Sequence, residues 1–328
     1  MLLNLKTAHI LVTGGAGFMG SAFIRFVLKQ EGFFGPVTNL DLLTYAGNLG
    51  NVASVEKDPR YTFYHGDIRD RPLLEQIHKE NPIHVIVHFA AETHVDRSIE
   101  GPAPFLDTNV LGTHHLLEFV RSHPDIHFHH ISTDEVYGTL GKEGIFTENS
   151  PYKPNSPYAA SKASADHFVR SYGVTYKLST TISHASNNYG PNQFPEKFIP
   201  LMIQNALNQK ALPVYGLGEN MREWLYVEDH ARAIWTILQN GNSGEVYNIG
   251  GGSEMRNIDL LHLILKKIKE LTGMENLEKR ITFVSDRPGH DFRYAMDGSK
   301  VEKLGYRPIW SLEEGISETI KSFLEILV

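Results

Sequence analysis

A glycine-rich turn between an expected strand and an expected helix constrains this fold more than any other sequence feature. Residues 6–20 pass from a largely apolar, β-branched run into closely spaced glycines, and a helix-like segment follows over 21–30. Gly14 and its neighbour permit the tight turn, Gly17 lets the main chain approach a pyrophosphate, and Gly20 lets the helix pack close to the sheet. The pattern predicts the first β-α unit of a dinucleotide-binding domain, with phosphates at the helix N-terminus.

An acidic residue ends the next expected strand. Residues 36–40 read as a strand and Asp41 follows them, about 20 residues beyond the glycine turn, where a carboxylate accepts hydrogen bonds from the adenosine ribose. Because this carboxylate would repel a 2′-phosphate, we predict NAD rather than NADP as the cofactor. The alternative is that Asp41 is an ordinary turn residue or helix cap.

Strand-like and helix-like segments alternate along the first half of the chain. Further strands are expected over 61–67, 84–89 and 126–132, and helices over 71–80, 104–121 and 157–168. Repeated β-α-β order predicts an α/β fold with a doubly wound parallel (Rossmann) sheet, whose ligands lie beyond the carboxyl ends of the strands. A chain of 328 residues exceeds the size of one core, so we expect a smaller C-terminal substrate-binding domain as well.

Composition excludes several classes of function. The formal net charge is −7 and there is no basic run, so we expect neither a nucleic-acid nor a membrane partner. The absence of cysteine excludes disulfides, thiolate nucleophiles and zinc-thiolate sites. Apolar stretches are far shorter than a membrane span and the first strand is expected almost at once, so we predict no signal peptide and a cytoplasmic location.

A tyrosine and a lysine four residues apart form a candidate proton-transfer pair. Tyr158 and Lys162 lie in an alanine-rich segment that favours helix, so both side chains project from one face. A lysine ammonium and an oxidised nicotinamide both favour the tyrosine anion, so Tyr158 is predicted to act as a base. A surface helix that carries this spacing by chance is the alternative, and the glycine turn argues against it.

Two acids follow the strand expected over 126–132. Asp134 and Glu135 come directly after Thr133, and three consecutive side chains can reach one sugar only if the backbone leaves strand geometry near Thr133. Like charge and partial burial can keep one carboxyl protonated while the other stays ionised, which provides an acid and a base for elimination of water. The alternative is that both acids cap the next element.

Three histidines in the same strand invite a metal interpretation. His127, His129 and His130 have no carboxylate at ligand spacing nearby, so we expect no metal.

Taken together, the sequence resembles the extended short-chain dehydrogenase/reductase family and, within it, the dTDP-glucose 4,6-dehydratases. The resemblance runs nearly end to end and rests on the segments 13–20, 43–48, 90–98, 132–138, 187–191, 193–197, 222–230 and 286–291. The glycine turn and the Tyr-Lys pair mark only the superfamily, whereas the segments around Thr133, Glu196 and His290 are more specific. Leu42, Thr93 and the run Ser183-His184-Ala185-Ser186 depart from the usual pattern without removing a catalytic group.

The resemblance implies a reaction and a set of site residues. Oxidation at sugar C4 by NAD would precede loss of water across C5 and C6, and the hydride would return to C6. The implied catalytic residues are Thr133, Asp134, Glu135, Tyr158 and Lys162. The implied cofactor-binding residues are Gly14, Gly17, Phe18, Met19, Asp41, Thr44, Asp67, Ile68, Ala90, Ala91, Thr108, Tyr158 and Lys162. The implied substrate-binding residues are Thr93, Asn187, Lys197, Pro213, Tyr215, Arg222, Asn257, Arg287 and His290.

The resemblance also implies an organisation and leaves alternatives. The NAD-binding domain would comprise 1–185 and about 218–250, and the nucleotide-sugar-binding domain about 186–217 and 251–328. A homodimer packed through the helices near 104–121 and 157–172 is expected. A dehydratase acting on UDP- or CDP-glucose, a nucleotide-sugar 4-epimerase and a non-enzymatic NAD-binding protein remain as alternatives; the epimerase has no need of Asp134 and Glu135.

Overall fold

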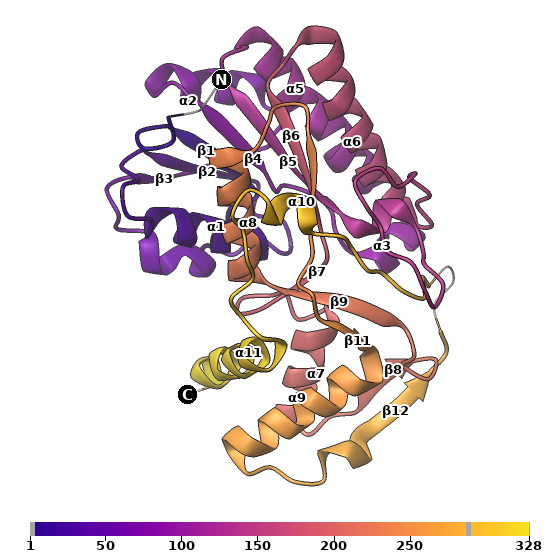
Figure 1. Ribbon diagram of the computed structural model, residues 1–328. Coiled ribbons are helices and arrows are strands. Elements are labelled where there is room, and N and C mark those ends of the chain that lie inside the picture. Colours follow the sequence, from indigo (N-terminus) through magenta and orange to yellow (C-terminus); the bar gives the residue numbers. More distant parts are fainter. Residues whose placement is uncertain (1–3, 287–289, 328) are drawn as a thin grey trace.

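A seven-stranded parallel sheet forms the larger part of the molecule in the computed structural model, which describes residues 4–286 and 290–327 (Figure 1). The strands lie in the order β10-β6-β5-β4-β1-β2-β3. Their bounds are β1 Ile10–Thr13, β2 Val37–Asp41, β3 Tyr61–His65, β4 Val85–His88, β5 His127–Thr133, β6 Thr180–Ala185 and β10 Val246–Ile249. The order reverses between β1 and β4, and a ligand crevice is expected at such a point. The predicted doubly wound parallel sheet is confirmed.

Helices cover both faces of this sheet, and each face has its own hydrophobic core. On one face α1 packs against α8, and on the other α5 packs against α6. The helices of this part are α1 Phe18–Leu28, α2 Arg71–Glu80, α3 Val95–Glu100, α4 Ala103–Phe105, α5 Thr113–Ser122, α6 Pro157–Tyr176, α8 Val227–Asn240 and α10 Ser299–Glu302. Short helical turns lie at η1 Leu49–Val55, η2 Leu106–Gly112 and η3 Asp134–Tyr137.

Capping residues in the sequence explain where the helices of the larger part begin. The Ser156 hydroxyl accepts from the Ala159 N–H and Pro157 opens α6, while Asp70 accepts from the Leu73 N–H at the start of α2. The helix expected over 104–121 is present but contains a π-helical turn, η2, in its first half. Hydrophobic periodicity did not reveal this turn, because within it Asn109 and Gly112 are buried whereas Leu106 and Leu111 are exposed.

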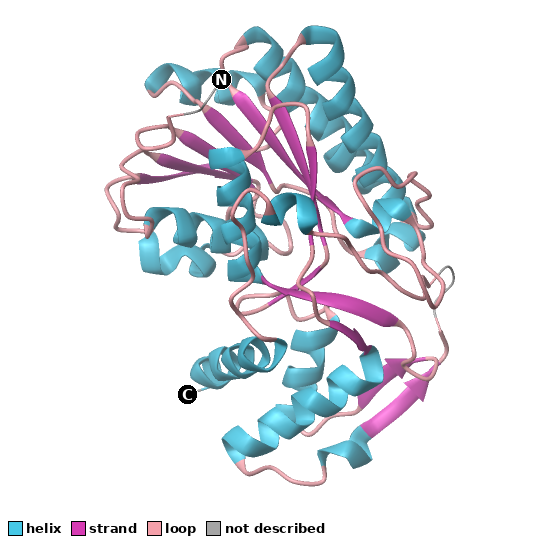
Figure 2. Cartoon of the chain, viewed as in Figure 1, coloured by secondary structure: helices cyan, strands magenta, loops and turns pink. Residues whose placement is uncertain are grey.

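A smaller part lies beyond the carboxyl ends of the main sheet (Figure 2). Its three-stranded sheet has the order β11-β9-β7, and β12 pairs with β8 in a separate ribbon. The elements are β7 Asn187–Tyr189, α7 Phe198–Leu207, β8 Leu212–Tyr215, β9 Met221–Tyr226, β11 Glu254–Arg256, α9 Asn257–Thr272, η4 Leu277–Arg280, β12 Ile281–Val284 and α11 Leu312–Leu327. These elements enclose a third hydrophobic core.

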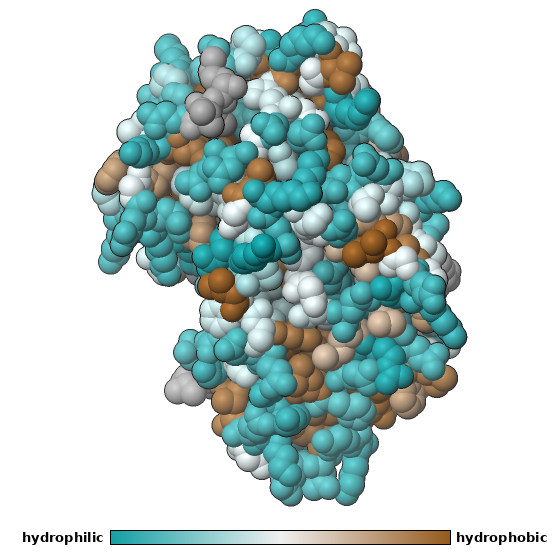
Figure 3. Space-filling model, viewed as in Figure 1, coloured by the Kyte–Doolittle hydropathy of each residue, from teal (hydrophilic) through white to brown (hydrophobic). Residues whose placement is uncertain are grey.

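The chain crosses between the two parts repeatedly. β9 belongs to the small three-stranded sheet, but the next two elements, α8 and β10, return to the main sheet. The expected domain boundaries stay a prediction. Figure 3 shows one face of the molecule, on which apolar side chains gather in separate patches rather than a continuous belt. Across the described residues, no helix combines the length and apolar character needed to cross a membrane.

Candidate active site

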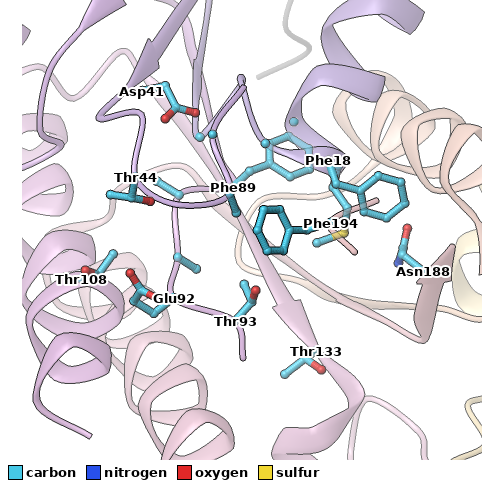
Figure 4. A pocket seen from close by; sticks show the side chains of 18 of the residues that line it. Phe18, Asp41, Thr44, Phe89, Glu92, Thr93, Thr108, Thr133, Asn188 and Phe194 are labelled. Carbon is cyan, nitrogen blue, oxygen red and sulfur yellow. The ribbon is translucent and has the colours of Figure 1, made fainter. Parts of the chain in front are cut away.

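A large pocket opens at the carboxyl ends of the main sheet and collects most of the residues named from the sequence. It is lined by the glycine turn after β1, by Asp41 after β2, by Ala90 after β4 and by Thr133 at the end of β5. Figure 4 looks into it, with Asp41 at one end of the view and Thr133 at the other. Every residue implied for cofactor binding except Lys162 lines this pocket.

The glycine turn needs glycine at two positions for identifiable reasons. Gly14 has a φ of +70°, and a Cβ there would lie 2.7 Å from the Ala90 nitrogen. A Cβ on Gly20 would lie 2.3 Å from the Gly14 carbonyl oxygen. The N-cap residue of α1, Gly17, provides no side-chain cap, so the first turn of the helix presents main-chain N–H groups to the pocket. This cradle fits a dinucleotide diphosphate.

Asp41 has two roles in the same place. Its carboxylate accepts hydrogen bonds from the Ala16 N–H and the Leu43 N–H, each at 2.8 Å, and it lines the pocket. Two carboxylate oxygens offer about four acceptor sites, so lone pairs remain for ribose hydroxyls. Asp67 also lines the pocket and is held by a bidentate ion pair with Arg69, at 2.7 Å for its shortest contact. The residues present therefore fit NAD.

The backbone leaves strand geometry at Thr133, as the sequence required. β5 ends there, and Asp134 begins the short helical turn η3. The Thr133 hydroxyl donates to Asp134 Oδ1 at 3.1 Å and accepts from the Glu135 N–H at 3.3 Å. Thr133, Asp134, Glu135 and Tyr158 all line one pocket, so three consecutive side chains reach the same cavity.

Asp134 is suited to hold a proton. Its side chain is buried, and burial together with the neighbouring charge of Glu135 raises the pKa of the Asp134 carboxyl well above its usual value. Among the described residues, its Oδ2 atom has no hydrogen-bond partner. A protonated Asp134 beside Glu135 gives the acid and base that the two adjacent carboxyls predicted.

The expectation that Lys162 favours the Tyr158 anion is not met by the contacts in this structure. Burial and the charges of Glu135 and Asp134 raise the pKa of Tyr158, and the Thr133 hydroxyl opposes them. The Lys162 ammonium points elsewhere: it donates to the Ile131 carbonyl at 2.7 Å and lies 3.3 Å from His130 Nε2. Burial lowers the pKa of Lys162 to about 8, so it is charged at neutral pH.

Asn109, which sequence reasoning missed, ties the walls of the site together. It lies in the π-helical turn, accepts from the Glu92 N–H at 2.8 Å, and donates to the Glu92 carbonyl and to the Ser161 hydroxyl. Glu92 lines the pocket, and Ser161 adjoins Lys162. A single buried asparagine in a helical pattern carries no sequence signal of this role.

Unpaired polar atoms gather where a sugar nucleotide would enter. Asn187, Lys197 and Thr93 line the pocket, and the Lys197 ammonium donates to the Thr93 carbonyl at 2.9 Å. Further oxygen atoms lining the pocket are buried and lack partners in the described part of the chain; they belong to Ser186, Asn187, Asn188 and Gln193. Buried polar groups without partners are costly, so these atoms favour a polar ligand.

Arg222 is a buried cation near the acids. It is 5% exposed, donates to the Asp291 carbonyl at 2.9 Å and lies over the Tyr294 ring at 4.5 Å. In residues 4–286 and 290–327 no carboxylate forms an ion pair with it, which leaves its charge for an anionic ligand. Its charge lowers the pKa of Asp134, against the larger effects of burial and Glu135.

Pro213, Tyr215, Asn257 and His290, which were also implied for the substrate, do not line the main pocket. Pro213 and Tyr215 are in β8, the Tyr215 ring packs edge-on against His290 at 6.0 Å, and Asn257 begins α9 with a buried Oδ1 atom unpaired within the described chain. Arg287 lies outside the described residues.

The outer wall of the pocket contains a second group, whose members lie in segments that carry the resemblance but were given no role from the sequence. Glu196 accepts from the Tyr45 hydroxyl at 3.3 Å and from Arg97 at 3.0 Å, and the Arg97 guanidinium lies 3.9 Å from the Tyr45 ring centre. Glu196 and the residues beside Tyr45 line the pocket. These contacts join three segments that are far apart in the sequence.

The strand histidines bind hydroxyl groups. His127 contacts Ser179 and Thr181 at 2.9 Å, and His129 contacts Thr181 at 2.8 Å and Ser183 at 3.2 Å. No group of three potential metal ligands occurs in the part of the chain that is described.

Comparison with known proteins decides the family. Residues 11–319 match the protein family described as GDP-mannose 4,6 dehydratase. The dTDP-glucose 4,6-dehydratase of Shigella flexneri is 48% identical over 96% of this chain and 92% of its own. The chain belongs to the dTDP-glucose 4,6-dehydratase family. A crystal structure of the dTDP-glucose 4,6-dehydratase from Bacillus anthracis in complex with NAD superimposes with a TM-score of 0.88 at 46% identity, covering 97% of both chains.

The fold alone would not separate this dehydratase family from its epimerase relatives. The UDP-glucose 4-epimerase of Thermotoga maritima, solved with UDP-glucose, has a TM-score of 0.87 over 98% of this chain and 100% of its own, at 30% identity. The distinction therefore rests on sequence identity, which is 48% to the Shigella flexneri dehydratase and 30% to this epimerase.

Proposed function

We propose that this protein is an NAD-dependent dTDP-glucose 4,6-dehydratase that forms dTDP-4-keto-6-deoxyglucose. The observation that carries this proposal is the pair Asp134 and Glu135 in one pocket with Tyr158, with the pKa of Asp134 raised by burial and by Glu135. A 4-epimerase needs one proton-transfer group for oxidation at C4, whereas a dehydratase also needs an acid and a base for loss of water. The identity of 48% to the Shigella flexneri dehydratase supports the same conclusion.

The cofactor is held, in this proposal, by the cradle at the start of α1 and by Asp41. Gly14, Gly17 and the first turn of α1 would bind the diphosphate, and Asp41 would accept from ribose hydroxyls. When bound, NAD would supply a positively charged ring that accepts hydride from sugar C4 and later returns it to C6.

Each proton transfer is assigned to one side chain. Tyr158 takes the proton of the C4 hydroxyl, helped by the Thr133 hydroxyl, which opposes the upward shift of the Tyr158 pKa. The C4 ketone acidifies the hydrogen on C5, and Glu135 removes it. Asp134, whose pKa is raised, then protonates the departing C6 hydroxyl so that it leaves as water, and Glu135 would return its proton to C5 when the hydride reaches C6. Lys162 contributes a buried positive charge one helical turn from Tyr158.

The substrate is held from the other side of the pocket. We propose that Arg222 and Lys197 meet the diphosphate, because both are cations and the chain is acidic overall. Asn187 and Thr93 would meet the sugar end, and Pro213, Tyr215, Asn257, Arg287 and His290 the nucleoside end. In this division, residues 1–185 and about 218–250 bind NAD, and about 186–217 and 251–328 bind the nucleotide sugar.

Rapid mixing with dTDP-glucose tests the assignment of the acids. Glu135→Gln and Asp134→Asn should still oxidise C4, so enzyme-bound NADH should accumulate, while product formation falls by roughly 10²–10⁴-fold. Tyr158→Phe should block the NADH signal itself, because it acts first. Elimination at the wild-type rate in both acid variants would show that the carboxyls are structural and that the dehydratase assignment is wrong.

We further propose that the enzyme is a cytoplasmic homodimer. Several apolar side chains of η2 and α6 are exposed: Leu106, Leu111, Phe168, Val174 and Tyr176. A second copy packed through these helices would cover them. Sedimentation of the purified protein should give about twice the mass of 37.0 kDa, and Val174→Glu should favour the monomer. Both proposed ligands are cytoplasmic metabolites, which supports this location.

A further inference from the structure

A buried polar network lies next to Lys162 and has no assigned part in the reaction described above. Its centre is the Asp166 carboxylate, one helical turn beyond Lys162 on α6 and 1% exposed. Asp166 Oδ2 accepts from the Ser132 hydroxyl at 2.9 Å and lies 3.0 Å from His184 Nε2. His184, in β6, is also fully buried. A buried carboxylate requires compensation.

The hydrogen bonds around His184 determine its protonation. Asn248 Nδ2 donates to the Phe146 carbonyl at 3.2 Å, which fixes the amide orientation and makes Asn248 Oδ1 an acceptor. The Tyr137 hydroxyl donates to that oxygen at 2.9 Å. The same Tyr137 oxygen lies 2.7 Å from His184 Nδ1. Since the single phenolic hydrogen is already used, this contact is a hydrogen bond only if Nδ1 carries a proton.

The opposite side of the ring also requires a proton. His184 Nε2 faces the Asp166 carboxylate, which can only accept, and the Tyr152 hydroxyl lies 3.0 Å from the same nitrogen. In a neutral His184 with its hydrogen on Nε2, Nδ1 could only accept a hydrogen bond. The Tyr137 hydroxyl would then have to donate to Nδ1 instead of to Asn248 Oδ1. Asn248 Oδ1 would then be left with only the 3.4 Å contact to His184, as a buried acceptor without a donor. With Asp166 ionised, as the Ser132 hydroxyl that donates to it favours, only the doubly protonated ring satisfies every contact.

The network reaches Lys162 through a second histidine. His130 Nε2 lies 3.3 Å from the Lys162 ammonium nitrogen and 3.4 Å from Asp166 Oδ1. Asp166 stabilises the charged form of Lys162, against the effect of burial. A positive charge on His184 partly cancels the field of Asp166. The charge on Lys162 therefore depends on both members of the pair.

We propose that His184 is a buried imidazolium paired with Asp166, and that this pair is a positioning element that sets the pH at which Lys162 loses its proton. The part that concerns Lys162 rests on the proposed function, because it assumes that Tyr158 needs a charged Lys162 during oxidation at C4. The charge on His184 does not depend on that function.

Other titratable groups surround the pair and Lys162 on every packed element. They are His88 on β4, His130 on β5, Tyr137 on η3, Glu148 and Tyr152 in the loop before α6, and Tyr158 on α6. Burial lowers the pKa of His88 to about 3 and lowers that of His130 well below its usual value, so both rings are neutral. The same burial raises the pKa of all three tyrosines. His184, Asp166 and Lys162 are left to carry the charge at the centre of the network, and the charge of Glu148 acts on Tyr137 from the loop.

The charge on His184 is measured directly by NMR of the NAD-bound enzyme with labelled histidine rings. The His184 signals are identified by their loss in His184→Gln. They should show an imidazolium with both nitrogens protonated at pH 7, and they should remain so at pH 8. Ring signals of a neutral imidazole at pH 7 would overturn the proposal, whatever the enzyme's activity.

The effect on Lys162 is measured by the pH dependence of NADH formation after mixing with dTDP-glucose. Lys162 is active when charged, so the rate should fall as the pH rises through its pKa. His184→Gln removes a positive charge, so the pH at which the rate falls should rise by about one unit. Asp166→Asn removes a negative charge, so that pH should decrease. His129 lies on the same sheet but is bonded to Thr181 and Ser183. His129→Gln is therefore the matched control and should leave the pH at which the rate falls unchanged.

The outcomes of the two measurements separate the two proposals. In one outcome, His184→Gln and Asp166→Asn both lower the maximal rate and leave unchanged the pH at which it falls. That result would show a merely structural role and refute the link to Lys162. An enzyme that forms no NADH with any sugar nucleotide would refute the proposed function, and the NMR result would still decide the charge on His184.

Discussion

Buried histidines should make the folded protein sensitive to mild acid, and His127 allows the effect to be measured for one residue. His127 begins β5, at the end of the sheet away from the pocket, and its ring nitrogens contact Ser179 and Thr181. Burial lowers the pKa of His127 to about 4. We change this residue to glutamine and lower the pH from 7.5 to 5.5.

The magnitude follows from proton linkage. The unfolded chain binds a proton at His127 with a pKa of about 6.5, whereas the folded chain stays neutral over this range. Because only the unfolded state takes up the proton, stability is greatest above pH 6.5 and is lost as the pH falls. From pH 7.5 to 5.5 the proton-binding term of the unfolded state grows about tenfold, so one such histidine costs about 1.4 kcal/mol. His88 and His230, with pKa values lowered to about 3, add to the loss in the same direction.

Urea unfolding, followed by tryptophan fluorescence at equal protein concentrations, gives the comparison. The free energy of unfolding should fall between pH 7.5 and 5.5 by about 1.4 kcal/mol less in His127→Gln than in the wild type. His262→Gln, on the exposed face of α9, is the control and should follow the wild type. Equal pH dependence in His127→Gln and the wild type would mean that His127 takes up its proton as readily in the fold as in the unfolded chain, and the burial argument would fail.

Three further predictions concern the ligands. Gly20→Ala should weaken NAD binding in calorimetry, because its Cβ would lie 2.3 Å from the Gly14 oxygen, whereas Gly101→Ala, with open space around it, should not. NAD should bind far more tightly than NADP. Asp41→Asn, which keeps one acceptor oxygen, should reduce this difference in affinity. Equal affinities of the wild type for NAD and NADP would contradict the assignment of Asp41 to the ribose site. The kcat/KM should favour dTDP-glucose over UDP-glucose by roughly 10–200-fold, since the two bases differ by one methyl group; a preference for UDP- or CDP-glucose would contradict the assignment of the base.

The sequence predicted the elements of the larger part well as far as α6, because periodicity and turn residues act locally, but it did not predict β6, α8 or β10. The helix expected over 71–80 has those bounds in the structure, where Asp70 caps it. The strand expected over 126–132 is β5, and the backbone leaves strand geometry directly after Thr133, as the convergence of the three side chains required. The smaller part was harder to predict. β7 and β11 each have three residues and pair across long separations, so neither carries a pattern of its own.

The site divided in the same way between what the sequence could and could not reveal. Residues at strand ends, such as Asp41 and Asp134, were predictable because a parallel sheet brings its carboxyl ends together. The direction of the Lys162 ammonium was not, because it depends on the Ile131 carbonyl and on His130 in a neighbouring strand. Nor could the sequence reveal that Asn109 binds Glu92 and Ser161, since that depends on a π-helical turn.

The repeated crossing of the chain between its two parts has a consequence for how the protein can be divided. β7, β8 and β9 lie in the smaller part, α8 and β10 return to the main sheet, and β11 leaves it again. A cut at any single peptide bond therefore leaves one product without part of its sheet or core. Expressed fragments that end near residue 186 would lack β10 at the edge of the main sheet and the α8 side chains that cover one face, including Ile234. The two parts should accordingly unfold as one cooperative unit, and limited proteolysis should release no stable half.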